Sequence, residues 1–111
     1  MTKDPKIFLR HILESIDIIE RYSVGVSKEE FLKNIGLQDQ IVRRVEIIGE
    51  AVKNIPEDFK SKHPTVPWKK ISGTRDFLIH EYFSVDLELL WVVVQKELPN
   101  LKVNIEKFLS E

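Results

Sequence analysis

The chain has 111 residues, of which 42% are hydrophobic and 32% are charged, which predicts one globular domain over residues 1–111 without room for a second core. The formal net charge is -1, which excludes a protein that coats duplex DNA through its overall charge, so any contact with nucleic acid must rest on a local patch. There is no cysteine, which excludes disulfides, thiolate zinc sites and cysteine nucleophiles.

The amino-terminal residues, Met1 to Pro5, lack the apolar core of a signal peptide. No apolar run approaches the ~20 residues that a membrane-spanning helix needs. Together with the absence of cysteine, which fits a reducing compartment, these features predict a soluble, cytoplasmic protein that does not bind membranes.

Two helices are predicted in the first third of the chain. Asp4-Pro5 is typical of an N-cap followed by proline at the first helical position, and the helix that it begins should reach about Tyr22. Ser27 and Glu30 have the spacing of a capping box. The capping box predicts a short helix over residues 28–34.

The Asn-Ile-Gly sequence at 34–36 is expected to break the chain before its clearest helix, over residues 38–54. There the apolar residues recur at alternating spacings of four and three, which form one continuous stripe: Ile41, Val45, Ile48, Val52 and Ile55. Residues 56–67 are expected to form a loop or a short helical turn.

Three further helices are predicted in the second half. The first should begin near Trp68 or Ser72 and end around Tyr82 or Phe83, the next should be capped by Asp86, and the last should begin at Pro99. The three valines at 92–94 favour a strand locally, but the surrounding helical pattern should override that propensity. We therefore predict an all-α fold, an up-and-down bundle of five to six helices.

The richest chemistry lies in the segment from residue 71 to residue 83. If this segment is helical, Arg75 and Tyr82 share a face, and the Asp76 carboxylate can reach the His80 imidazole four residues later. Arg75 and His80 then lie about 140° apart around the helix. Both can border one site only in a groove formed with another helix or another subunit.

These side chains suit RNA cleavage without a metal ion. A histidine with a pKa near neutrality can take the proton from a ribose 2′-OH or return one to the leaving oxygen. The Arg75 guanidinium offers a planar pair of donors to the phosphate. The Tyr82 hydroxyl can hold a phosphate oxygen or accept a covalent modification.

A basic run leads into this segment, because no Asp or Glu occurs between Phe59 and Arg75. Its lysines are candidate RNA contacts: Lys60, Lys62, Lys69 and Lys70. Trp68 could stack on a base, but a core anchor is the expected role. His11 and His63 are expected at the surface and have no metal-ligand spacing with His80, so neither a metal ion nor another cofactor is predicted.

The order Arg75-x4-His80-x-Tyr82 resembles the signature of the HepT-like toxins of the HEPN superfamily. Further matches extend the resemblance over nearly the whole chain: residues 47–51, Pro67-Trp68, Val85-Asp86 and Leu98-Pro99. The resemblance implies a homodimer with both motifs in a cleft between the subunits. It implies a metal-independent endoribonuclease that cleaves tRNA or mRNA, the toxin of a type VII-like toxin–antitoxin system.

In that family the antitoxin is a minimal nucleotidyltransferase that adenylylates the motif tyrosine, here Tyr82, and it can assemble with the toxin into a larger complex. The family often has asparagine where this chain has Asp76. A carboxylate there can orient His80, but it also repels the scissile phosphate and can pair with Arg75.

Two alternatives follow. The first is a non-catalytic HEPN module that binds a nucleotidyltransferase partner or a nucleotide, which Asp76 and the slight acidity of the chain favour. The second is a purely structural helical dimer, which does not account for the basic run beside the Arg–His–Tyr cluster.

Overall fold

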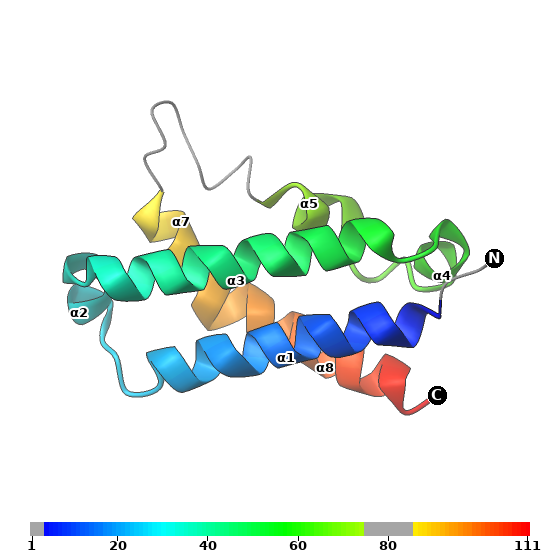
Figure 1. Ribbon diagram of the computed structural model, residues 1–111, viewed down its shortest axis with the longest axis horizontal. Coiled ribbons are helices and arrows are strands. Elements are labelled where there is room, and N and C mark those ends of the chain that lie inside the picture. Colours follow the sequence, from blue (N-terminus) through cyan, green and yellow to red (C-terminus); the bar gives the residue numbers. More distant parts are fainter. Residues whose placement is uncertain (1–3, 75–85) are drawn as a thin grey trace.

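The computed structural model describes residues 4–74 and 86–111, and within these ranges every regular element is a helix (Figure 1). The predicted all-α bundle is confirmed. Two long antiparallel helices, α1 and α3, lie side by side, and the carboxyl-terminal helix α8 packs against α1.

The caps predicted for the first two helices are confirmed. Helix α1 (Pro5–Ser23) begins after Asp4, whose side chain accepts a hydrogen bond of 2.9 Å from the Lys6 backbone N–H. Helix α2 (Lys28–Lys33) has the reciprocal capping box of Ser27 and Glu30, with both bonds at 3.1 Å. The pKa of Glu30 is lowered because its carboxylate accepts the backbone and side-chain hydrogen bonds of Ser27.

The break predicted over 34–36 is narrower in the structure. Helix α3 (Ile35–Asn54) begins directly after Asn34, which ends α2 and caps α3 by accepting a bond of 3.0 Å from the Leu37 N–H. Gly36 therefore lies inside the first turn of α3. Its low helix propensity costs about 1 kcal/mol, which the asparagine cap offsets.

Two short helices follow α3. Helix α4 (Glu57–Lys62) occupies the region expected as a loop or short turn, and helix α5 (Trp68–Ser72) begins where predicted and is capped by Gly73. The predicted continuation of that helix toward Tyr82 lies outside the described residues.

The last part of the chain is one run of helix: α7 (Leu87–Val92), a π-turn η2 (Val93–Glu97) and α8 (Leu98–Leu109). The Asp86 side chain caps α7 through the Leu89 N–H at 3.0 Å, as predicted. Pro99 explains the wider π-turn, since proline has no N–H to donate and its ring would clash with the carbonyl four residues earlier. The valines at 92–94 are helical, as predicted.

The core is formed by one face each of α1, α3 and α8, together with residues from the short helices. Its fully buried members are nearly all apolar, among them Ile12, Ile16, Ile41, Val52, Leu90 and Ile105, and those of α3 follow the predicted stripe. The only buried polar residues are Ser15 and Gln38 within the described ranges. The Gln38 side-chain amide donates a bond of 2.9 Å to the Phe31 carbonyl, which attaches α2 to α3.

Ion pairs join α8 to α1 at the surface. Lys102 Nζ lies 3.0 Å from Glu20 and 3.1 Å from Asp17. The pKa of Lys102 is raised, because its ammonium donates hydrogen bonds to Glu20 and Asp17. No helix in the described ranges is both long enough and apolar enough to cross a membrane.

Candidate active site

The predicted catalytic and modified residues, Arg75, Asp76, His80 and Tyr82, all lie outside the described residues. The structure places the residues on either side of them. Thr74 follows α5, and Asp86 caps α7. The described part of the candidate site therefore consists of the residues around Thr74 and Asp86.

Helix α5 holds the start of the segment closely against α3 at Gly49. A Cβ atom on Gly49 would lie 3.4 Å from the Ile71 carbonyl oxygen and 3.5 Å from that of Ser72. A methyl group can be accommodated at these distances, whereas a larger side chain would push α5 away. Gly49 thus marks the place where the backbone of α5 lies against α3 just before Arg75.

An apolar hollow of about 290 Å³ lies between α3, α5 and the run of helix from α7 to α8. Its wall includes Val45, Ile48 and Ile71, and both Thr74 and Leu89 border it. The hollow is therefore bordered by Thr74, the last described residue before the motif, and by Leu89 in the first turn of α7. Lys70 and Glu97 also line it, with Nζ and Oε1 3.7 Å apart.

A second, open depression lies over the end of α3, α4 and α5, and we call it the lysine groove. Four lysines and one glutamate supply its charged lining: Lys53, Lys60, Lys69, Lys70 and Glu57. Three of the four lysines predicted to contact RNA thus line one groove, and Lys62 does not. Lys53 was missed because it precedes the acid-free run and joins the others only through the turn after α3.

The groove lysines differ in how they are paired. Lys60 Nζ lies 3.5 Å from Glu57 and its side chain is only 14% exposed, while Lys70 faces Glu97. Lys53 and Lys69 have no ion pair with any described residue, and both are exposed. These two ammonium groups are therefore the ones available to an anionic ligand.

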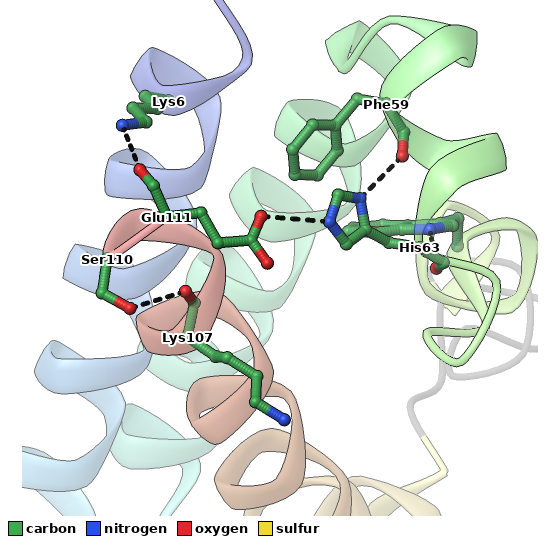
Figure 2. Close-up of polar contacts among 7 residues, drawn as sticks. Lys6, Phe59, His63, Lys107, Ser110 and Glu111 are labelled. Atoms are coloured by element: carbon green, nitrogen blue, oxygen red, sulfur yellow. Dashed lines mark hydrogen bonds and ion pairs between the residues drawn. The ribbon is translucent and has the colours of Figure 1, made fainter.

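His63, expected at the surface, is only partly exposed, with 16% of its side chain accessible (Figure 2). Its ring stacks on Phe59 at 4.2 Å and contacts Phe108 at 4.2 Å between centroids. Nδ1 donates to the Phe59 carbonyl at 2.9 Å, and Nε2 lies 3.3 Å from the Glu111 carboxylate. With both nitrogens engaged, His63 connects α4 to the end of α8, and it does not line the lysine groove. His11 is exposed, as predicted.

Trp68 has the predicted core role. It is 7% exposed, and its indole N–H donates a bond of 2.9 Å to the His63 carbonyl. Because its ring packs near Phe59 and Phe108, it cannot stack on a base from this position. Within residues 4–74 and 86–111, no group of histidine and carboxylate side chains is arranged to hold a metal ion.

Comparison with known proteins relates the chain to ribonucleases. Residues 12–108 match the family model described as "Ribonuclease HepT-like". No solved structure matches the chain at a significant level.

Three relatives illustrate the similarity. A protein of Methanocaldococcus jannaschii named "Gamma-glutamylcyclotransferase and putative RNase" is 50% identical over the whole chain, which spans 50% of that relative's length. A "Putative RNase" of Caldanaerobacter subterraneus subsp. tengcongensis is 44% identical over 98% of this chain and 97% of its own. A "Probable ribonuclease HepT" of Thermococcus cleftensis is 44% identical over 96% of this chain and 97% of its own.

Proposed function

Since the chain belongs to the ribonuclease HepT-like family, we propose that it is a metal-independent endoribonuclease in which Arg75 and His80 carry out RNA cleavage. The observation that carries this proposal is the order Arg75-x4-His80-x-Tyr82 inside the matched region. We further propose that two copies form a homodimer whose cleft holds the motifs.

His80 starts the reaction by taking the proton from a ribose 2′-OH. The 2′ oxygen then forms a bond to the adjacent phosphorus while the bond from phosphorus to the 5′ oxygen breaks. The leaving 5′ oxygen takes up a proton from water, and His80 later releases the proton that it took. The products are a 2′,3′-cyclic phosphate on one fragment and a 5′-OH on the other. Arg75 stabilises the negative charge that builds up on the phosphate oxygens.

The described surroundings support this assignment. Thr74, the last described residue before Arg75, borders a hollow with largely apolar walls, and a phosphate bound in apolar surroundings would interact more strongly with an arginine than one in water. The lysine groove lies next to the same hollow.

The proposal is tested with purified protein and two substrates of one sequence, an RNA and the corresponding DNA, in the presence of EDTA. We expect cleavage of the RNA with unchanged rate when EDTA is added, and no cleavage of the DNA, because DNA lacks the attacking 2′-OH. Cleavage that disappears with EDTA and returns with a divalent cation would contradict the metal-independent mechanism.

We also propose that the protein is the toxin of a toxin–antitoxin pair, neutralised by a minimal nucleotidyltransferase that adenylylates Tyr82, in a complex that can contain more than one copy of each. An adenylate phosphate beside Arg75 and His80 would offset their positive charge and block the substrate phosphate.

The test is co-expression with a minimal nucleotidyltransferase, followed by mass measurement of the peptide that contains Tyr82. We expect this peptide to gain the mass of adenylate and the modified protein to lose RNA cleavage. A Tyr82→Phe variant is the control and should remain unmodified. Inhibition of that variant to the same degree would show that binding, and not modification, neutralises the toxin.

A further inference from the structure

We propose that the lysine groove binds the sugar–phosphate backbone of single-stranded RNA, with Lys53 and Lys69 as its principal phosphate contacts, and that it guides the strand toward the motif. This inference rests on the proposed ribonuclease function and adds the path of the substrate to it.

The charges of the groove favour a polyanion. Four of the five charged residues that line it are lysines, in a chain whose net charge is -1. Lysine presents a compact ammonium on a flexible stem, which suits phosphates at variable positions better than a fixed array of donors. Lys60 and Lys70 are partly neutralised by Glu57 and Glu97, so Lys53 and Lys69 supply the charge that no described residue pairs.

The groove also leads toward Thr74, the last described residue before Arg75. Val66, Pro67 and Lys70 line both the lysine groove and the apolar hollow. The hollow is bordered by Thr74, whose hydroxyl donates a bond of 3.1 Å to the Lys70 carbonyl. A strand that lies over Lys53 and Lys69 and continues past Lys70 therefore reaches the residue immediately before Arg75.

The same surface does not have the features of a protein-binding site. Protein interfaces are anchored by buried aromatic or aliphatic side chains, whereas Val66 and Trp68 of the groove are 3% and 7% exposed and belong to the core. The large exposed hydrophobic residues of the described chain lie elsewhere: Ile7, Tyr22, Val24, Ile35, Val92 and Val103. Among the described residues that line the groove there is no exposed aromatic ring to stack on a base, so binding should depend on the backbone and not on the sequence.

The experiment compares the double variant Lys53→Gln/Lys69→Gln with Lys96→Gln/Lys107→Gln, which removes two exposed lysines outside the groove. Binding of labelled single-stranded RNA of about 20 nucleotides is measured by fluorescence anisotropy over a range of salt concentrations. Cleavage of the same RNA and of a four-nucleotide fragment that spans the cleavage position is followed in parallel.

For the groove variant we expect the Kd for the long RNA to rise about tenfold at ~0.1 M salt. The slope of log K against log salt concentration should become shallower by about 1.4, because two phosphate contacts are lost and each contributes about 0.7. KM for the long RNA should rise while kcat stays unchanged. The short fragment should be cleaved as by the unaltered protein, and the control variant should retain its affinity and its slope.

Equal affinity and equal slope for the two double variants would overturn the groove assignment, even if the unaltered protein cleaves RNA. That result would exclude RNA as the ligand of Lys53 and Lys69 and would favour an acidic protein surface in its place. If the unaltered protein binds RNA with the expected dependence on Lys53 and Lys69 but cleaves nothing, the groove assignment stands and the proposed ribonuclease function fails.

Discussion

Replacement of His80 by alanine is expected to lower kcat for RNA cleavage about 10²- to 10⁴-fold, the contribution of a positioned general acid or base. His80 is the only histidine in the motif. The other two histidines lie elsewhere: His11 is exposed on α1, and His63 is held by Phe59 and Glu111. The measurement is the single-turnover rate on a labelled RNA, with circular dichroism to establish that the variant is folded.

His11→Ala is the matched control, because it removes an exposed imidazole and should leave the rate unchanged. Loss of cleavage in His11→Ala, or a His80→Ala variant as active as the unaltered protein, would remove His80 from the mechanism. An Arg75→Lys variant completes the series. It keeps the positive charge but loses the planar pair of donors, so a strong loss of rate there would indicate bidentate contact with the phosphate.

Asp76→Asn separates the two roles open to Asp76 in the same assay. A lower rate would mean that the carboxylate orients His80. A higher rate would mean that it repels the substrate phosphate or occupies Arg75. If none of the variants at 75, 76 and 80 changes cleavage or toxicity while binding to a nucleotidyltransferase persists, the non-catalytic module is the better description.

Replacement of Phe31 by alanine is expected to reduce the free energy of unfolding by 3–5 kcal/mol, roughly the range for removing a buried aromatic side chain. Phe31 is 1% exposed and is the one buried residue of α2. Its ring lies 5.3 Å from that of Trp91 between centroids, and its carbonyl accepts the Gln38 bond. It therefore joins α2 to both α3 and α7.

Urea unfolding followed by circular dichroism gives this free energy. Phe31→Leu is the graded control, because it retains an apolar side chain of intermediate volume and should cost distinctly less. A cost below about 1 kcal/mol for Phe31→Ala would contradict the packing of α2 described above. The loss would matter for function as well, since total stabilities of small domains are only about 5–15 kcal/mol.

Local features of the fold could be predicted well from the sequence. The caps at Asp4, Ser27 and Asp86 depend on residues within three positions of each other, so their spacing alone identifies them. The stripe of α3 is equally clear because a buried helix face repeats every three or four residues. The break at 34–36 was overestimated, since the composition of a turn does not reveal that one asparagine ends one helix and caps the next.

Features that depend on distant residues could not be predicted. His63 contacts Glu111, 48 residues later, and nothing in its neighbouring sequence indicates a ring enclosed by Phe59 and Phe108. Lys53 joins the lysine groove because α4 and α5 fold back beside the end of α3. The motif itself was found from its residue order, but the relation of Arg75, Asp76, His80 and Tyr82 in space stays a prediction.

The π-turn between α7 and α8 has a consequence for how the lengths of relatives can vary. A π-turn takes up one residue more than an α-turn between the same two points on the helix axis. A relative without proline at the position of Pro99 can therefore carry a one-residue deletion here and still present the residues equivalent to Leu101, Ile105 and Phe108 to the core. Single-residue gaps between relatives should gather at this turn, while the helical segments before and after it keep their spacing.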